Sequence, residues 1–266
     1  MPDAATLLAA YDAQLRARVP ERLPAGETLE RDGPLLRFSG SPGHGFVLYR
    51  DLGGIEGEAL DELIARQVAA YAARGERFEW KYHSHDLPAD LPKQLRAAGF
   101  VSEDTETIVI APVAAIAGEP DLPTGVALRE VTTREDFGRI ATLEQAVWGD
   151  EDQHGWLVDM LESERAVDPE SLTIIVAEAG STVVCAAWVR FAYGTEFATL
   201  WGGATLPDWR RRGIYRATVA YRANLAAAQG FRYLETDASD DSRPILERLG
   251  FIAVTKTTPF IWSPAS

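Results

Sequence analysis

A run of basic residues follows an apolar stretch late in the chain. Residues 205–216 read Thr-Leu-Pro-Asp-Trp-Arg-Arg-Arg-Gly-Ile-Tyr-Arg. The apolar stretch before them predicts a strand, and the amphipathic stretch after them predicts a helix. The first backbone N–H groups of a helix have no partner and carry partial positive charge, so they attract anions. Gly213 permits the close approach of a ligand and the arginines add charge, so the segment predicts a phosphate cradle. The alternative is a basic loop that only caps a surface helix.

The elements around this segment form an alternating α/β pattern. We expect strands at residues 126–131, 173–178, 183–191, 197–206 and 233–238, and helices at 156–164, 214–228 and 243–248. A further helix, capped by Thr132 or Thr133, is expected after the first strand. The whole frame, from the apolar strand through Arg-x-x-Gly to Leu-Gly-Phe at 249–251, favours the phosphate cradle over a surface loop.

This frame resembles the GNAT family of acyltransferases, in which Arg or Gln-x-x-Gly-x-Gly or Ala binds the pyrophosphate of coenzyme A. The resemblance covers residues 126–262. Arg210 and Gly213 match the signature, whereas Tyr215 stands where the family usually has Gly or Ala. The resemblance implies an α/β fold with a mixed sheet and acetyl-coenzyme A as the co-substrate.

The resemblance also assigns residues to this co-substrate. The backbone at the end of the strand before the arginines would pair with pantetheine as though with another strand, and the strand at 233–238 would splay away to admit it. The expected cofactor-binding residues are Gly203, Ala204, Thr205, Arg210, Arg211, Arg212, Gly213, Ile214, Tyr215 and Ser239.

The group that protonates the departing thiolate is missing from its usual place. In the family a tyrosine often stands on the helix before Leu-Gly-Phe, but the matching position here is Leu246. Because a thiol ionises with a pKa of about 8.5, a thiolate can leave near neutral pH at small cost. Ser242, Ser239 and Tyr215 are candidates for a replacement donor. For the two serines the alternative is capping of the helix that begins near Arg243.

A base is also required, because an acceptor amine must lose a proton before it attacks the thioester. A carboxylate that acts directly or through water is the usual solution. The candidates are Glu144, on the helix after Thr133, and Glu235 and Asp237, which share one face of their strand. For each of them the alternative is an ordinary solvated or salt-bridged carboxylate.

The chain of 266 residues is long enough for two domains. A stretch rich in proline and glycine between residues 110 and 126 predicts a linker, so we expect domains at 1–118 and 119–266. The first domain shows a similar order of elements. Its expected helices are near 5–18, 58–73 and 91–98, and its strands lie within 27–50, at 77–84 and near 106–110.

The two parts also share local sequence. Ala-Arg-Gly-Glu-Arg-Phe around Gly75 resembles Ala-Gln-Gly-Phe-Arg-Tyr around Gly230, and Leu-Arg-Ala-Ala-Gly-Phe ending at Phe100 resembles Leu-Glu-Arg-Leu-Gly-Phe ending at Phe251. Two matches in the same order predict two tandem GNAT-like domains, although Gly-Phe is also a common helix end. The loop at 51–58 carries carboxylates where arginines would be needed. The N-terminal copy is therefore expected to be degenerate, and the chain to bind one coenzyme A.

The composition argues against several classes of protein. A formal charge of −14 repels nucleic acid, and no apolar run approaches the length of a membrane span. The N-terminus lacks the positive flank of a secretory signal, and the lone Cys185 cannot form an internal disulfide. We therefore expect a cytoplasmic protein with neither a nucleic-acid nor a membrane partner.

Other chemistry has little support in the sequence. His83 and His85 could form half of a metal site, but no further cluster completes it, so no metal is expected. No serine stands in Gly-x-Ser-x-Gly, and the apolar surroundings of Cys185 predict a core residue, which argues against a hydrolase. The loop at 149–155 is a candidate lid over the acceptor. The aromatic residues near it and in the following strands, Trp148, His154, Trp156, Trp188, Tyr193 and Trp201, are expected mainly in the core.

Together these features predict a tandem GNAT-like protein whose C-terminal half transfers an acetyl group from acetyl-coenzyme A directly to an amine. The acidic surface favours a small-molecule or small cationic amine as the acceptor. Two alternatives stay open. One is a regulatory or structural protein that binds coenzyme A without turnover, and the other is a tandem-domain transferase of another acyl group.

Overall fold

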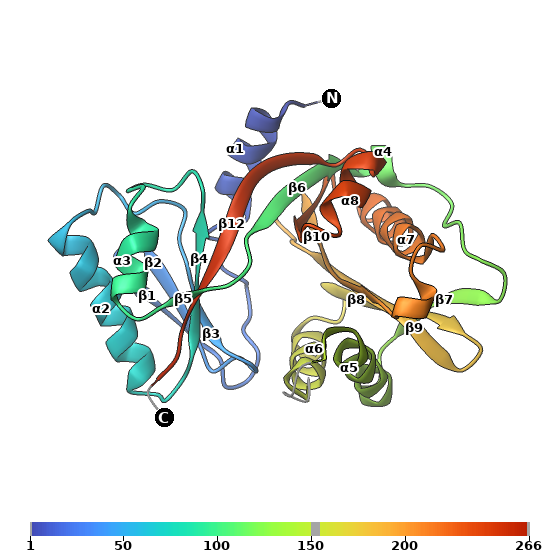
Figure 1. Ribbon diagram of the computed structural model, residues 1–266, viewed down its shortest axis with the longest axis horizontal. Coiled ribbons are helices and arrows are strands. Elements are labelled where there is room, and N and C mark those ends of the chain that lie inside the picture. The colour runs from blue at the N-terminus through green and yellow to red at the C-terminus, as the bar shows by residue number, and fades with distance from the viewer. Residues whose placement is uncertain (1, 150–154, 265–266) are drawn as a thin grey trace. The chain divides into compact units, whose positions relative to one another are not determined.

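The computed structural model describes residues 2–149 and 155–264, and its contacts divide the chain into two compact α/β units (Figure 1). We call residues 110–236 and 244–252 the C-terminal unit, and residues 2–109, 237–243 and 253–266 the N-terminal unit. Strand β6 (Glu106–Pro112) leads from the N-terminal unit into the C-terminal unit. No helix in the described part of the chain is long and apolar enough to cross a membrane.

The C-terminal unit is built on strands β7 (Val126–Val131), β8 (Leu172–Ala179), β9 (Thr182–Phe191), β10 (Phe197–Thr205) and β11 (Tyr233–Ala238). Strands β7 to β10 pair antiparallel in sequence order, and β11 adds to β10 in parallel. The parallel pair needs a crossover, which is supplied by helix α7 (Ile214–Ala228). The short helix α4 (Val113–Ile116) contacts α7, and the short helix α8 (Arg243–Leu249) follows β11 in the sequence.

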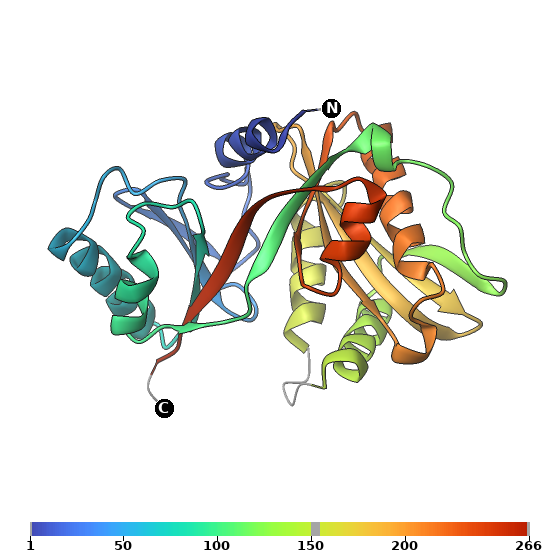
Figure 2. The ribbon, with the colours of Figure 1, turned by 45° about the horizontal axis from the view of Figure 1, so that its top comes forward.

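Helices α5 (Arg134–Trp148) and α6 (Gly155–Val167) lie on the opposite face of this sheet from α7 (Figure 1, Figure 2). The Thr133 hydroxyl caps α5 by accepting the backbone N–H of Asp136 at 3.2 Å. Helix α5 turns a stripe of side chains toward the core at helical spacing, and that stripe includes Phe137, Ile140 and Glu144.

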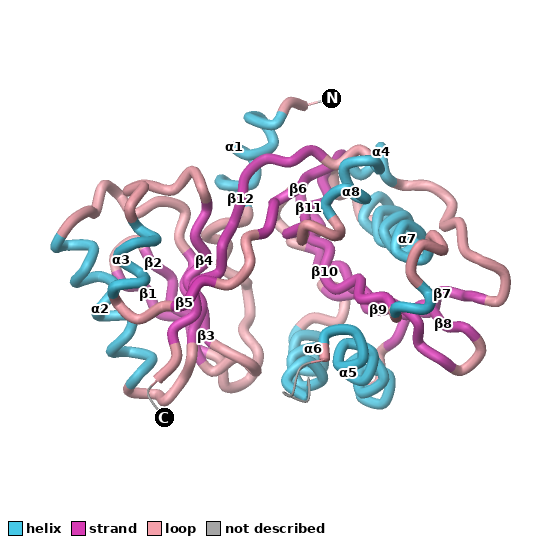
Figure 3. The backbone as a smooth tube through the Cα atoms, in the orientation of Figure 1, coloured by secondary structure: helices cyan, strands magenta, loops and turns pink. Residues whose placement is uncertain are grey.

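The N-terminal unit repeats the same pattern. Strands β1 (Thr28–Asp32), β2 (Leu35–Ser39) and β3 (Gly45–Leu48) pair antiparallel, and β4 (Phe78–His83) adds to β3 in parallel after helix α2 (Glu58–Ala72). Helices α2 and α3 (Leu91–Ala97) lie together on one side of these strands (Figure 3). Their side chains enclose an aromatic core with Tyr71, Phe78, Trp80 and Phe100. Helix α1 (Ala4–Gln14) precedes the strands.

Most of the last strand belongs to the N-terminal unit, so the two units are not two consecutive stretches of the sequence. Strand β12 (Ile252–Trp262) pairs antiparallel with β4, from Thr257 opposite His83 to Trp262 opposite Phe78, and the short β5 (Val101–Ser102) pairs with it as well. The contacts therefore place the C-terminal end of the chain in the N-terminal unit. They do not follow a single boundary at residue 118, and separate roles for residues 1–118 and 119–266 stay a prediction.

Candidate functional site

The end of β10 has one open edge. Its register with β11 runs from Phe197 opposite Tyr233 to Thr199 opposite Glu235, whereas its register with β9 continues to Thr205. Gly203, Ala204 and Thr205 thus lie beyond the last described pair with β11. The sequence placed these three residues at the cofactor, and the open edge has the geometry that strand-like pairing with an extended ligand needs.

A bulge shapes the same stretch of β10. The β9 register shifts between Gly202 and Ala204, so that Gly203 is the extra residue. Gly203 has a φ of +101°, a conformation that side-chain-bearing residues rarely adopt. The bulge therefore depends on a glycine at this position.

The segment after β10 forms a tight basic turn, which we call the arginine loop (residues 207–213). A 3-10 helix (Pro207–Trp209) leads into extended backbone at Arg210, and Arg211 and Gly213 have φ values of +60° and +84°. Gly213 is the N-cap of α7, and the Ala217 N–H donates to the Gly213 carbonyl at 3.0 Å. The N–H groups before Ala217 have no partner within the helix, so the 15-residue α7 presents them to any ligand at the loop.

Four arginines, Arg210, Arg211, Arg212 and Arg216, belong to the arginine loop and the first turn of α7. The Arg210 Nε donates to the Thr205 carbonyl at 3.0 Å, and the Arg212 guanidinium lies 4.7 Å from the centre of the Trp209 ring. Arg211 and Arg216 are exposed. Within residues 2–149 and 155–264, no carboxylate forms an ion pair with any of these four arginines. Their positive charge is thus available to an anion, although the protein as a whole is acidic.

Tyr215 lies in the first turn of α7, one residue after Ile214, and its ring packs on β10. A Cβ built on Gly203 would lie 2.6 Å from Cε2 of the Tyr215 ring. Burial raises the pKa of the Tyr215 phenol above its usual value, so the hydroxyl is protonated near neutral pH. The structure therefore brings Gly203 and Tyr215, both predicted at the cofactor, into direct contact.

The replacement acids are arranged less favourably. Leu246 on α8 is fully buried and has no proton to donate. Ser239 and Ser242 lie in the turn before α8, where the Ser239 hydroxyl accepts the Ser242 N–H at 3.3 Å and the Arg243 N–H donates to the Ser239 carbonyl at 2.9 Å. This is the capping arrangement that the sequence left open as the alternative. Both serines fall in the N-terminal unit, whereas the arginine loop falls in the C-terminal unit.

Among the candidate bases, Glu144 is the most unusual. It is 8% exposed, and one of its oxygens accepts the indole N–H of Trp148 at 2.7 Å. The other oxygen, Oε1, is buried without a hydrogen-bond partner among the described residues. Burial raises the pKa of Glu144, and the bond from Trp148 opposes that shift only in part. A buried carboxylate with a free oxygen is suited to accept a proton.

The other two candidates have protein partners. Glu235 is buried in β11 and is held by other groups of the protein. The Asp237 carboxylate forms an ion pair of 2.6 Å with Lys81. Burial by itself would lower the pKa of Lys81, but Asp237 and Glu79 together hold that pKa well above its usual value. Asp237 therefore faces a permanent ammonium charge.

Sequence reasoning missed the strand neighbours of Asp237. Burial, and then repulsion from Asp237, raises the pKa of Glu106 to about 7. Glu79 and Lys81 are two residues apart on β4, so their side chains lie on the same face of the sheet. This spacing of two charged residues is visible in the sequence. What the sequence could not show is that Asp237 pairs with this face.

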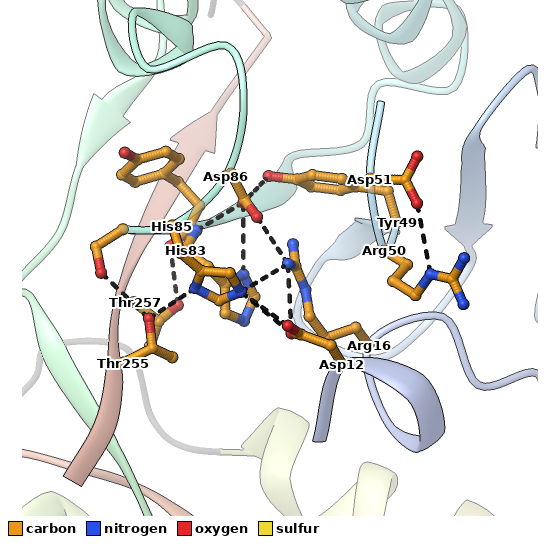
Figure 4. A network of polar contacts seen from close by, with 12 residues as sticks. Asp12, Arg16, Tyr49, Arg50, Asp51, His83, His85, Asp86, Thr255 and Thr257 are labelled. Atoms are coloured by element: carbon orange, nitrogen blue, oxygen red, sulfur yellow. Dashed lines mark hydrogen bonds and ion pairs between the residues drawn. The ribbon is translucent and has the colours of Figure 1, made fainter. Parts of the chain in front are cut away.

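His83 and His85, the two histidines considered for a metal site, both contact other side chains of the protein (Figure 4). The His83 Nε2 lies 3.0 Å from the Tyr11 hydroxyl, and the His85 ring nitrogens lie 2.8 Å from the Thr255 hydroxyl and 3.1 Å from the nearer Asp12 oxygen. Across the described residues, no three His, Cys, Asp or Glu side chains are grouped as a metal site would require.

The candidate lid and its aromatic neighbours have mixed placements. Residues 150–154, and with them His154, lie outside the described residues. Trp188 is buried as expected, but Trp148, Trp156 and Trp201 are between 43% and 62% exposed. These three, together with Tyr193 at 42%, are surface residues, and their expected place in the core was wrong.

Comparisons with known proteins show what this part of the chain is similar to. Residues 137–251 match the sequence model of the Acetyltransferase (GNAT) family. A GCN5-related N-acetyltransferase from Kribbella flavida superposes with a TM-score of 0.69 at 15% identity, over 100% of this chain and 97% of the other. A GCN5-related N-acetyltransferase from Sphaerobacter thermophilus gives 0.61 at 13%, over 98% and 91%.

A tandem GNAT protein from the clavulanic acid biosynthesis pathway gives a TM-score of 0.61 at 16% identity, over 99% of this chain and 95% of the other. At these identities the structural likenesses establish the fold alone. No curated protein matches the sequence significantly. The expected tandem GNAT-like α/β fold is confirmed, because the matches extend over both units.

Proposed function

We propose that this chain is an acetyltransferase of the GNAT type that transfers an acetyl group from acetyl-coenzyme A to an amine, which is supported by the match of residues 137–251 to the family model and by the tandem GNAT fold. The observation that carries this proposal is the arginine loop. Its four arginines form no ion pair with a carboxylate in the described part of the chain, and they lie with the first N–H groups of α7 directly after the open edge of β10. A diphosphate fits the arginines and the N–H groups, and an extended arm that contains amide groups fits the open edge of β10.

Each part of the donor would have its own contacts. The loop from Arg210 to Gly213, with the N–H groups of Ile214 and Tyr215, would hold the pyrophosphate. The backbone of Gly203, Ala204 and Thr205 would pair with the pantetheine arm, which carries amide groups.

Glu144 is the base that we favour for the transfer. As the amine nitrogen bonds to the thioester carbon, it gives up a proton, and the free Oε1 of Glu144 takes that proton directly or through water. The carbon–sulfur bond then breaks and coenzyme A leaves as the thiolate, which solvent can protonate because its pKa is about 8.5. No covalent enzyme intermediate is required. Glu235 and Asp237 are retained as second candidates for the base, and Ser242 as a candidate acid.

The two halves are proposed to have different roles. Residues 119–266 would hold the co-substrate, and residues 1–118 would serve as a degenerate copy that binds none. A net charge of −14 favours a small or cationic amine as the acceptor over nucleic acid. We place this reaction in the cytoplasm.

One observation favours a second function. Leu246 departs from the catalytic pattern that the resemblance implies, and Tyr215 departs from its cofactor-binding signature, as they would in a protein that binds coenzyme A without turnover. Thiol release from acetyl-coenzyme A, followed over a panel of amines, separates the two. Release that depends on the amine supports the transferase, and tight binding without any release supports the binding protein. Replacing acetyl by longer acyl groups in the same assay tests the identity of the donor.

A further inference from the structure

At the point where the register of β10 with β11 ends, a side chain takes the place of the backbone. The Tyr233 N–H donates to the Glu196 carbonyl, just before β10, at 3.0 Å. Bonds along a parallel pair are evenly spaced, so every second carbonyl from Glu196 onward faces β11, and Leu200 carries one of these carbonyls. Its donor in the structure is the Thr236 hydroxyl, at 2.8 Å.

A backbone donor would occupy this place if the ladder continued. The register ends with Thr199 opposite Glu235, so the next N–H in the series of bonds belongs to Asp237. On β11 the C-terminal unit extends to Thr236, and Asp237 belongs to the N-terminal unit. A threonine hydroxyl can satisfy a backbone group in place of a sheet ladder. Thr236 thus supplies the donor at the residue where β11 leaves the C-terminal unit.

The other edge of β10 is held by β9 and α7. Trp201 lies opposite Trp188 just before the bulge, and Nη1 of Arg222 donates to both of their carbonyls, at 3.0 Å for Trp201 and 3.1 Å for Trp188. Arg222 is 1% exposed, and its Nε donates within α7 at 3.0 Å. Beyond the bulge, the Leu206 N–H still donates to the Val184 carbonyl at 3.0 Å. Strand β10 therefore stays attached to β9 to its end, and the edge that opens is the one toward β11.

We propose that Thr236 is a positioning residue for the acyl donor, because its hydroxyl takes the Leu200 carbonyl and so ends the β10–β11 ladder. This inference rests on the proposed function. The edge beyond this point includes residues 203–205, where the pantetheine arm would pair. Without the hydroxyl, the Leu200 carbonyl takes a backbone N–H of β11, the ladder gains a pair, and β11 competes with the arm for the edge. The nucleotide end of the donor, which needs only the arginine loop, binds as before.

Calorimetry with two ligands tests this inference. Coenzyme A has the arm, whereas adenosine 3′-phosphate 5′-diphosphate is its nucleotide part, with the pyrophosphate but without the arm. Thr236→Val removes the hydroxyl and keeps the branched side chain, so we expect coenzyme A to bind at least about threefold more weakly than in the wild type, while the nucleotide binds as before. Thr236→Ser keeps the hydroxyl and should bind both ligands like the wild type.

Thr257→Val is the matched control, since the Thr257 hydroxyl also donates to a carbonyl of a neighbouring strand, that of Tyr82 at 3.1 Å in the N-terminal unit. It should alter neither affinity, and thermal unfolding shows that each variant is folded. Three results overturn the role of the hydroxyl and leave the proposed function standing: unchanged coenzyme A binding in Thr236→Val, equal losses for the two ligands, or a loss in Thr236→Ser as large as in Thr236→Val. If the wild type binds neither ligand, the proposed function fails, and this inference fails with it.

Discussion

The indole N–H of Trp148 donates a hydrogen bond of 2.7 Å to one carboxylate oxygen of Glu144, while the other oxygen is buried with no partner among the described residues. The two residues lie one turn apart on α5, so the helix itself sets their geometry. A buried acceptor with no donor costs free energy in the folded protein. That cost is recovered when a ligand or a proton arrives, and the relationship therefore leads to two predictions.

The first concerns turnover. Glu144→Gln should lower the rate of amine acetylation about a hundredfold or more, because the amide cannot take the proton, and coenzyme A affinity should be unchanged. Glu135→Gln, on an exposed turn of the same helix, is the control and should leave both quantities as they are. A loss of less than tenfold at Glu144 would shift the role of base to Glu235 or Asp237, each tested by its amide variant.

The second concerns stability and pH. Burial raises the pKa of Glu144 in the folded state above its unfolded value, which is about 4.3. The stabilisation linked to its protonation is then full below that unfolded value, and it is lost as the pH rises through the folded pKa. Urea unfolding at a series of pH values should show Glu144→Gln gaining stability relative to the wild type as the pH rises. If the difference in unfolding free energy between the two proteins is the same at pH 4 and at pH 8, the Glu144 carboxylate is solvated and not buried.

The sequence was sufficient for features that depend on neighbouring residues. The arginine loop, the glycine at its end and the helix after it are contiguous, and the structure has them as expected. The cap at Thr133 was also found, because capping needs only a side chain and the next turn. Even the burial of Glu144 has a local signal, since it falls in the apolar stripe of Phe137 and Ile140.

Features that join distant segments could not be predicted in this way. The pairing of β12 with β4, and the ion pair of Lys81 with Asp237, bring together residues from opposite ends of the chain. Nothing in either local sequence specifies the partner, because strand partners are chosen by the packing of the whole sheet. The contact of Tyr215 with Gly203 is similar: the sequence shows an unusual residue, but only the structure shows where its ring lies.

The third prediction concerns the arginine loop. Gly213→Val should weaken coenzyme A binding at least tenfold, about 1.4 kcal/mol, because Gly213 has a φ of +84° that valine rarely adopts and because the side chain would hinder close approach. Gly194→Val is a matched control, with a φ of +80° in the turn before β10 and no atom within 4 Å of a built Cβ. It carries the same backbone strain without touching the loop. Equal coenzyme A affinities for Gly213→Val and the wild type would contradict the proposed site.

The fourth prediction concerns the buried ion pair in the N-terminal unit (Figure 4). Arg16 and Asp86 meet at 2.7 Å with side chains 2% and 3% exposed. Burial by itself would raise the pKa of Asp86, but hydrogen bonds from the His83 N–H, Arg16 and Tyr49 hold that pKa well below its usual range. Removing one member of such a pair leaves an uncompensated buried charge.

Arg16→Met should therefore lower the free energy of unfolding by roughly 3–5 kcal/mol at neutral pH, as measured in urea. Arg74→Met removes an exposed pair with Glu76 and should cost less than about 1 kcal/mol. Because the folded pKa of Asp86 is depressed, its stabilisation is present above the unfolded value of about 3.9 and is lost as the pH falls further. The difference in unfolding free energy between Arg16→Met and the wild type should accordingly become smaller below about pH 4. A difference that persisted there would show that the loss of stability does not come from the ion pair.

The last prediction is that one chain binds one coenzyme A. The N-terminal unit has its own loop between β3 and α2, at residues 51–58, in the place that the arginine loop has between β10 and α7. In this loop the Asp51 carboxylate accepts the Gly53 N–H at 3.0 Å, and the Ile55 N–H donates to the Leu52 carbonyl at 3.1 Å. Two of its N–H groups are thus already occupied by the protein, one of them by a negative charge.

A diphosphate would have to displace that carboxylate and then lie beside Asp51, Glu56 and Glu58, whose exposed negative charges repel it. Titration calorimetry of the whole chain should give a stoichiometry near one, and Gly213→Val should weaken that single binding event. The whole chain is needed because deleting residues 1–118 would remove β4, the partner of β12. Asp51→Asn, which removes one charge from the second loop, should leave the stoichiometry at one. A value near two in the wild type, with one site unaffected by Gly213→Val, would show that the N-terminal loop binds the co-substrate after all.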